Sequence, residues 1–174
     1  MIFRHLICIP LALLPTVVLL SGCGNEQQRP ADLPALYPCT VTVLQDGKPL
    51  SGGMVQFGSV DTNFKWSVFA QLDTEGKGKV FTQGLYPGAP EGEYKVMLSK
   101  TETVTEEVGP PVRQNVNEQM VMVTPTVDTI FSLVEKQYTK AETTPLSITI
   151  GKKKNDHQFD GGKPVREFLL KATP

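Results

Sequence analysis

Few residues in this sequence have side chains suited to catalysis, and they do not form a known catalytic pattern. Histidine occurs only at His5 and His157, so a site built from several imidazoles is excluded. The chain also has no Gly-x-Ser-x-Gly elbow, no His-Glu-x-x-His zinc motif, no Cys-x-x-Cys pair and no phosphate-binding glycine loop. We therefore predict that the protein is not an enzyme and has no catalytic residue and no cofactor.

Three carboxylates could be imagined as ligands for calcium. They are Asp61, Asp73 and Glu75, and they lack the twelve-residue loop spacing and the terminal bidentate glutamate of a calcium loop. The sequence therefore predicts no metal site.

One thiol, that of Cys23, follows an apolar segment near the N-terminus. Arg4 precedes an uncharged run of fifteen residues, 6–20, which is typical of an export signal. As a helix this run would be roughly 22 Å long, shorter than the ~30 Å hydrocarbon core of a bilayer, and two prolines interrupt it. The run therefore does not predict a transmembrane helix.

The residues Leu20, Ser21, Gly22 and Cys23 resemble the bacterial lipobox. In that motif a peptidase cleaves before the cysteine, whose thiol accepts a diacylglyceryl group. The resemblance implies that residues 1–22 are a lipoprotein signal peptide and that Cys23 is the lipid attachment site, carrying palmitate-type acyl chains. The alternative is an ordinary secretory signal in which small residues happen to precede a cysteine.

Residues 23–38 are polar and rich in proline, and we interpret them as the lipidated cysteine and a flexible tether. Gly24 occupies the position at which an aspartate would resemble an inner-membrane retention signal. We therefore expect a lipid-anchored protein of the bacterial cell envelope, in the outer membrane or at the cell surface rather than in the inner membrane.

Charge and cysteine content narrow the possible partners. Seventeen basic and eighteen acidic side chains give a net charge of −1, so the sequence does not predict nucleic-acid binding.

After loss of Cys8 and acylation of Cys23, Cys39 is the remaining thiol. Its neighbours alternate like a strand, which predicts a buried, reduced cysteine; the alternative is a disulfide to another chain.

Beyond Pro38 the hydrophobic pattern has period two and the turns are rich in glycine, which predicts an all-β domain over residues 39–174. We expect residues 40–44 to pair with 54–57, and 66–72 to pair with 79–82, with Trp66 facing the core. Further strands are expected at residues 93–98, 146–150, around Phe159 and at 168–170. Short strands joined by tight turns, without crossover helices, indicate an antiparallel β-sandwich of about seven strands.

Several of these turns, in order, resemble the transthyretin-like (prealbumin-like), carboxypeptidase-regulatory-like β-sandwich. The matching segments are residues 41–43, 46–50, 53–57, the Asp-x-x-Gly turn at 73–78 and the Pro-x-Gly-x-Tyr strand entry at 90–96. The resemblance spans residues 40–170 and implies a Greek-key fold. From the residues themselves, we expect Gly47, Gly76 and Gly92 to serve turns and Tyr94 to be a core aromatic with a hydrogen-bonded hydroxyl.

Residues 135–146 also resemble a segment of small bacterial lipoproteins built on this domain, with Glu135 where a proline is usual.

Residues 101–129 do not alternate cleanly and are interpreted as an insertion between two strands. Within it, residues 120–123 could form a short edge strand or an apolar binding face. The alternative is a mobile or self-packed excursion. A second candidate surface is the basic cluster at residues 151–155. We expect it at a hairpin tip as a solvated turn; the alternative is a contact with an anion or a membrane surface.

These features predict a non-catalytic binding or structural module of the envelope, held to the membrane by its lipid, with envelope proteins or glycans as candidate partners. The alternative is an accessory domain that recognises carbohydrate or peptide. An exposed row of aromatic side chains would favour sugar binding, because rings stack on sugar faces.

The first testable prediction concerns Cys23. Cys23→Ser removes the thiol that accepts the lipid, so we expect release from the membrane fraction or an unprocessed precursor, because each buried CH₂ of an acyl chain contributes ~0.8 kcal/mol to anchoring. Cys39→Ser is the matched control and should remain anchored. The measurement is membrane fractionation with mass spectrometry of the N-terminus; an unmodified mature N-terminus in the wild type would contradict the prediction.

Overall fold

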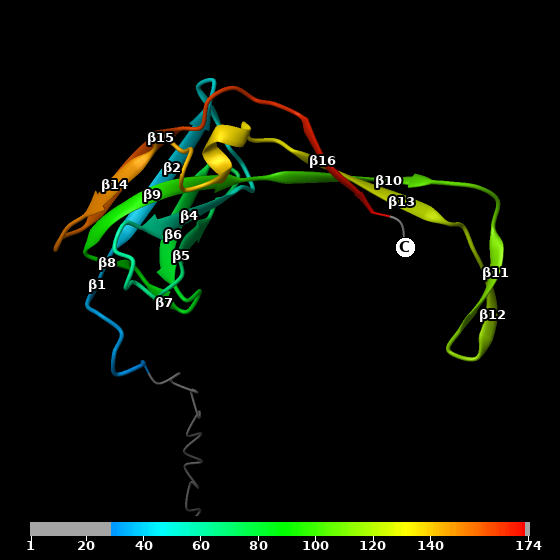
Figure 1. Cartoon of the computed structure of the whole chain (residues 1–174), viewed down its shortest axis with the longest axis horizontal. Coiled ribbons are helices and arrows are strands. Elements are labelled where there is room, and N and C mark those ends of the chain that lie inside the picture. The colour runs from blue at the N-terminus through cyan, green and yellow to red at the C-terminus, as the bar shows by residue number, and fades with distance from the viewer. Residues whose placement is uncertain (1–28, 173–174) are drawn as a thin grey trace, which may run out of the picture. The chain divides into compact units, whose positions relative to one another are not determined.

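The computed structural model describes residues 29–172, which form β-strands joined by turns, one short 3₁₀ helix and no α-helix (Figure 1). Contacts divide the chain into units Met1–Pro30 and Ala31–Pro174, and all strands belong to the second. Cys23 and the predicted signal peptide lie outside the described residues. The elements are β1 (Leu36–Tyr37), β2 (Cys39–Gln45), β3 (Lys48–Pro49), β4 (Met54–Ser59), β5 (Val68–Gln71), β6 (Lys77–Thr82), β7 (Tyr86–Pro87), β8 (Ala89–Pro90), β9 (Gly92–Ser99), β10 (Thr101–Glu107), β11 (Val112–Val116), β12 (Gln119–Val123), β13 (Thr126–Ser132), η1 (Lys136–Thr139), β14 (Ser147–Ile150), β15 (Asn155–Asp160) and β16 (Glu167–Ala172).

The all-β, sandwich-like fold is confirmed. Its main sheet has the strand order β14-β9-β4-β5-β6-β2-β15, with β3 paired to β2 and β7 to β6. Apolar side chains alternate along β2, β4 and β9 and meet in one core. Val41 and Val43 from β2 join Val55 from β4 and Val96 from β9, each fully buried. Burial of one face of each strand is what the period-two pattern requires.

Strand β6 joins the two layers because it lies between β5 and β2 in the strand order. Its residues Lys77–Lys79 pair with β2, and its residues Val80–Thr82 pair with β5. A 2.8 Å bond from the Asp73 amide to the Lys77 carbonyl continues the hairpin with β5 to the start of β6. The turn before it brings Gly76 so close to β2 that an added Cβ would lie 2.6 Å from the carbonyl oxygen of Val43. Gly76 also has a φ of +68° and its carbonyl accepts a 2.8 Å bond from the Val43 amide. Glycine is therefore required here for two independent reasons.

The prediction that residues 54–57 pair with residues 40–44 is wrong. The chain leaves β2 through a two-residue turn at Asp46 and Gly47, both with positive φ, and pairs only briefly with β3. Residues 49–53 then cross to the other layer, where β4 pairs with β5 and β9. Pro49 contributes no backbone N–H, which helps to end the hairpin at that point.

One strand pair also departs from the antiparallel expectation, because β15 runs parallel to β2. β14 pairs with β9 at one end of the strand order, and β15 lies at the other end. Residues 151–154 therefore cross between layers and are not a hairpin tip. The basic cluster predicted for a hairpin lies on this crossing.

The aromatic core at the sandwich edge is centred on Tyr94, as expected. The Tyr94 hydroxyl donates a 3.0 Å hydrogen bond to the Pro90 carbonyl, and the rings of Phe57 and Phe64 meet the Tyr94 ring edge-on at 6.3 and 5.7 Å. Burial raises the pKa of Tyr94 to about 12, so this hydroxyl remains a donor. Trp66, expected in the core, instead precedes β5 and is half-buried.

Part of the segment that the sequence assigned to the tether packs on the sandwich. Strand β1 pairs with β8, Leu33 is buried, and Asp32 forms an ion pair with Lys65. A proline-rich sequence can pair at the edge of a sheet for one or two residues, because its missing N–H groups face away from the ladder.

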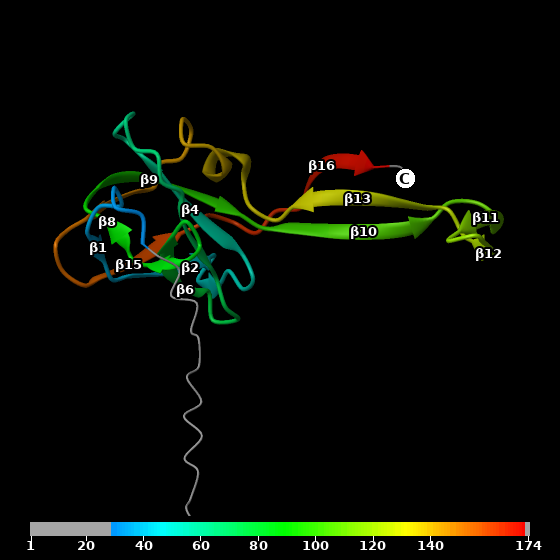
Figure 2. The same cartoon turned by 90° about the horizontal axis from the view of Figure 1, so that it is seen from below.

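A second sheet extends from the sandwich. Strand β10 continues β9 after the single residue Lys100, and it pairs with β13 over seven residue pairs (Figure 2). β16 adds to β13 on the other side, and the hairpin β11–β12 follows at the end. We call these five strands, residues 101–132 and 167–172, the arm. The expected insertion is therefore regular β-structure, and residues 168–170 belong to the arm rather than to the sandwich.

Two glycine substitutions test the close approach of Gly76. Gly47→Ala places a Cβ in open space at φ +74°, so only backbone strain applies and should cost about 1–2 kcal/mol of unfolding free energy. Gly76→Ala adds a collision with a β2 carbonyl and should cost about 3 kcal/mol or more. Urea denaturation measures both; equal losses would show that the contact with Val43 is not restrictive.

Candidate functional site

The arm consists of a three-stranded sheet in the order β10-β13-β16 and the separate two-stranded hairpin β11–β12. No residue of its five strands belongs to the hydrophobic core cluster of the sandwich. The β10–β13 hydrogen bonds continue to the edge of the sandwich, where the Leu133 amide donates a 2.9 Å bond to the Lys100 carbonyl. The next residue, Val134, is part of the hydrophobic core. The sandwich therefore holds the base of the arm, while most of the arm is in contact with solvent.

Exposed apolar side chains concentrate on the arm. Of the twelve large hydrophobic residues that are exposed in the described part of the chain, nine belong to the arm or the loop that links its strands: Val108, Val112, Val116, Met120, Val121, Met122, Phe168, Leu169 and Leu170. All six residues of β16 are exposed. Such a concentration of apolar surface is typical of an interaction site.

Arg166 attaches β16 to the base of the arm. Its Nε lies 2.8 Å from Glu102 Oε2 on β10, and its guanidinium lies 3.7 Å from the centre of the Phe131 ring on β13. Phe168 then meets Phe131 edge-on at 6.4 Å. One arginine thus contacts two strands and orders the start of the third.

Glu135 fixes the segment that leads to β16. Its Oε1 accepts a 2.7 Å bond from the Lys163 amide, and its Oε2 accepts a 2.8 Å bond from the Gln137 side chain. A Cβ on Gly162 would lie 2.5 Å from Glu135 Oε1 and 2.8 Å from the Tyr138 ring, so the two segments are in close contact. The residue that replaces the usual proline of the resembling lipoproteins therefore has a structural role here.

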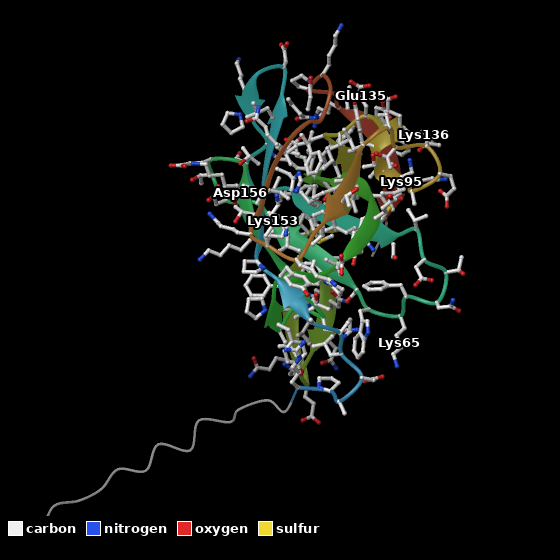
Figure 3. All side chains as sticks on the ribbon, turned by 90° about the vertical axis from the view of Figure 1, so that its left-hand side faces the viewer. Lys65, Lys95, Glu135, Lys136, Lys153 and Asp156 are labelled. Atoms are coloured by element: carbon white, nitrogen blue, oxygen red, sulfur yellow. The ribbon has the colours of Figure 1, made fainter. Side chains whose placement is uncertain are left out.

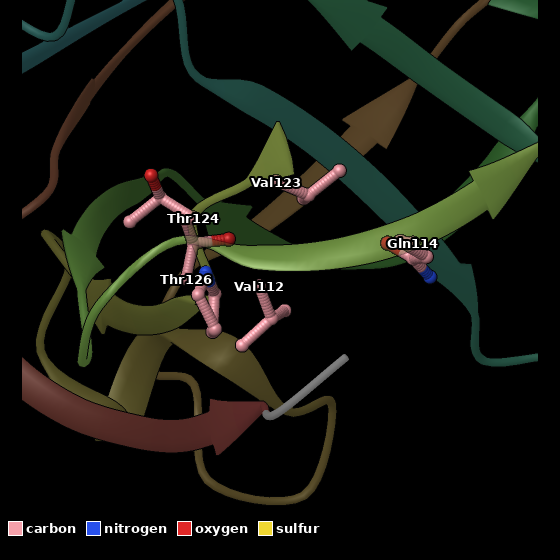
Figure 4. A pocket seen from close by; sticks show the side chains of 6 residues that line it. Val112, Gln114, Val123, Thr124 and Thr126 are labelled. Atoms are coloured by element: carbon pink, nitrogen blue, oxygen red, sulfur yellow. The ribbon is translucent and has the colours of Figure 1, made fainter. Parts of the chain in front are cut away.

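Two shallow pockets lie along the arm, each of about 360 Å³. The first is at the base of the tip hairpin, where Val112, Val123, Thr124 and Thr126 line it (Figure 4). The second is at the base, between the 3₁₀ helix and β16. The first pocket has no charged lining residue, and the second has Lys136, Lys140 and Glu167 beside the apolar Phe168 and Leu169. Both can accept side chains of a docking partner.

Cys39, the thiol predicted to be buried, is 4 % exposed and unpaired. Burial, with a contribution from the charge of Asp156, raises its pKa to about 11. The thiol is therefore protonated at neutral pH and unreactive.

The carboxylates considered for calcium serve turns instead. Asp73 Oδ1 accepts from the amides of Glu75 and Lys77 at 2.8 and 2.9 Å, and Asp61 Oδ1 accepts from the Asn63 amide at 2.9 Å. No group of three or more potential metal ligands occurs among residues 29–172. His157 stacks on Phe159 at 6.4 Å.

Two lysines of the basic cluster at residues 151–155 form ion pairs with nearby carboxylates. Lys152 pairs with Glu91 at 3.5 Å and Lys154 with Asp156 at 3.0 Å. Buried Asn155 organises the loop, since its Nδ2 donates to the carbonyls of Lys153 and Gly151 at 2.6 and 3.1 Å. Figure 3 shows Lys153 on this loop and Asp156 on the adjoining strand β15, well away from Lys65. Lys153 and Lys154 line one hollow together with Asp156 and His157, and the carboxylates of Glu91 and Asp156 pair with Lys152 and Lys154 of the cluster.

The sequence did not predict the arm as a regular sheet or Arg166 as its organising residue. One feature of the sequence could have indicated the tip hairpin. Asn117 and Glu118, both with positive φ, form the two-residue turn between β11 and β12. Asparagine is one of the few residues that adopts this conformation readily, so the turn could have predicted the hairpin.

Comparison with protein-family models, curated proteins and solved structures found no match of any of the three kinds. Within residues 29–172, no helix has the length and apolar character needed to cross a bilayer.

Removal of the tip hairpin tests whether the arm is separate from the core. Deleting residues 109–123 leaves Val108, Thr124 and Pro125 as a three-residue loop between the paired residues Glu107 and Thr126. Three-residue loops close antiparallel hairpins readily, so the unfolding free energy should stay within about 1 kcal/mol of the wild-type value. Thermal and urea unfolding measure this; an unfolded product would show that the hairpin contributes to the core.

Proposed function

We propose that this protein is a lipid-anchored module of the bacterial envelope that binds another protein through its arm and performs no catalysis. The lipobox resemblance at Cys23 supports the anchor. The transthyretin-like turn motifs support a sandwich that serves as a rigid base. The main support for the binding role is the exposure of nine large apolar side chains on the strands and linking loop of the arm.

A free-standing sheet of this kind needs a partner to be stable. Two-stranded ribbons are marginal in water, and a third strand helps only if an apolar face is covered. Here Phe168, Leu169 and Leu170 on the third strand are 61, 52 and 47 % exposed. A protein surface that covers them would bury their apolar area, at roughly 25 cal/mol per Å².

The charge of the arm favours a protein partner over an anionic one. Residues 101–132 contain five acidic side chains and one basic side chain, a balance of −4. Phosphate-bearing partners, whether nucleic acid or anionic lipid headgroups, would be repelled by this surface.

A peptide partner is the second candidate, favoured by the outer edge of β10. The strand order β10-β13-β16 leaves that edge without a neighbouring strand among the described residues, so its backbone groups can accept an added strand. Sugar binding has less support, since Phe168 is the single aromatic among the exposed large hydrophobic residues of the described chain.

Site-specific photo-crosslinking in intact cells tests the proposal. A crosslinking amino acid at Phe168 should form an adduct with one envelope protein, with a yield about tenfold above that of the same group at Leu85. Leu85 is the matched control because it is 51 % exposed but lies between β6 and β7 of the sandwich.

Equal adduct yields at the two positions, or none at Phe168, would refute the binding of another envelope protein by the arm. An adduct with a short peptide in place of a protein would select the second candidate.

A further inference from the structure

The outer edge of β12 at the tip of the arm has no neighbouring strand among the described residues. β12 pairs only with β11, in a two-stranded sheet. Its five residues, 119–123, carry no charge and no proline, and Met120, Val121 and Met122 are 65, 38 and 62 % exposed. Proteins usually protect such edges with charges, prolines or bulges, because a bare edge pairs with other strands. β12 has none of these protections.

The sequence of β12 is nearly symmetric about Val121, which suits pairing with itself. In an antiparallel pair with complete overlap of the five residues, Val121 lies opposite Val121 of the second copy and Met120 lies opposite Met122. Both methionines fall on one face and the central valines on the other, because side chains alternate along a strand. Each cross-strand pair at the centre is apolar, and such pairs stabilise a sheet.

The charges of the hairpin select the antiparallel direction. Arg113 lies near the base of the hairpin, opposite Met122, and Glu118 lies in the turn at its tip. Antiparallel pairing places the tip of one hairpin beside the base of the other, so the Glu118 end of each copy meets the Arg113 end of its partner. Parallel pairing would bring like charges together.

The other free edges of the arm are poorly suited to the same pairing. β11 carries the charge of Arg113 and has the polar residues Gln114 and Asn115 at its centre, so its central cross-strand pairs would not be apolar. β10 carries Glu102, Glu106 and Glu107, and two such strands would oppose like charges. β16 has a register shift opposite Ile130 and Phe131, and a bulge bends and twists an edge strand away from a flat partner.

We propose that two copies of this protein associate through their tip hairpins, with β12 antiparallel to β12 and a two-fold axis at Val121. The product is a four-stranded sheet in the order β11-β12-β12-β11, an isologous contact that closes on itself. This inference rests on the proposed binding role of the arm and names the partner of its tip. The contact is small, so it is weak in dilute solution and stronger where lipid anchors confine copies to one surface.

Cysteine crosslinking of the full-length protein in its membrane tests the register. Opposed residues of an antiparallel pair have Cα atoms about 4.5–5.5 Å apart, within the range that a disulfide spans. Val121→Cys should therefore form a dimer under mild oxidation. Gln119→Cys is the control, since the two copies of residue 119 would lie roughly 13 Å apart along the strands. The native Cys39 is buried and does not interfere.

Charge substitution at the same position separates pairing from misfolding. Val121→Glu and Val121→Lys should each reduce co-purification of two differently tagged copies by about tenfold, and co-expression of the two variants should restore it, because opposite charges then face each other. Val116→Glu on β11 has similar exposure, 44 % against 38 %, and should have no effect.

The outcomes distinguish this inference from the proposed function. If Val121→Cys forms no more dimer than Gln119→Cys, or if mixed charges fail to restore association, the pairing is refuted whatever Phe168 crosslinks to. If Val121→Cys forms the dimer and Phe168 gives no adduct, the inference holds and the arm serves self-association alone.

Discussion

The position of β6 between β5 and β2 is the constraint on which the rest of the structure depends. Without the pairing of β2 to Lys77–Lys79, β2 and β15 would have no place over the core, and Val41 and Val43 would lose their buried environment. The close approach of these strands is possible because Gly76 and Gly78 have no side chains: a Cβ on Gly78 would lie 2.7 Å from the Gln71 carbonyl. Two glycines thus allow two layers to form from one continuous set of hydrogen-bonded strands.

The alternation of apolar and polar residues predicted the strands of the sandwich but not the arm as a regular sheet. Strands such as β2 and β9 have one face buried in the core, so apolar residues alternate with polar ones along their sequences. Both faces of β10 are exposed to solvent, so neither face requires apolar residues and its Thr and Glu residues do not alternate with them. The pairing of strands that are distant in the sequence could not be predicted either, because alternation identifies a strand but not the strand beside it. The partners of β4 and the parallel direction of β15 could be known only from the three-dimensional arrangement.

The arm and the sandwich are stabilised in different ways. The sandwich has a shared apolar core and buried hydrogen bonds, such as that from the Thr144 hydroxyl to the Val96 carbonyl at 2.7 Å. The arm depends on its backbone ladder, on Arg166 and on half-exposed rings. We therefore expect the sandwich to keep its fold when the tip hairpin is removed, and the arm to gain order from whatever covers it.

The continuity of β9 into β10 has a mechanical consequence. β9 is hydrogen-bonded to β4 on one side and to β14 on the other. Because these bonds are perpendicular to the strands, tension applied along the arm loads both ladders in shear, and the bonds resist together rather than opening one after another. The arm is therefore joined to the sandwich through the direction in which a sheet withstands pulling best.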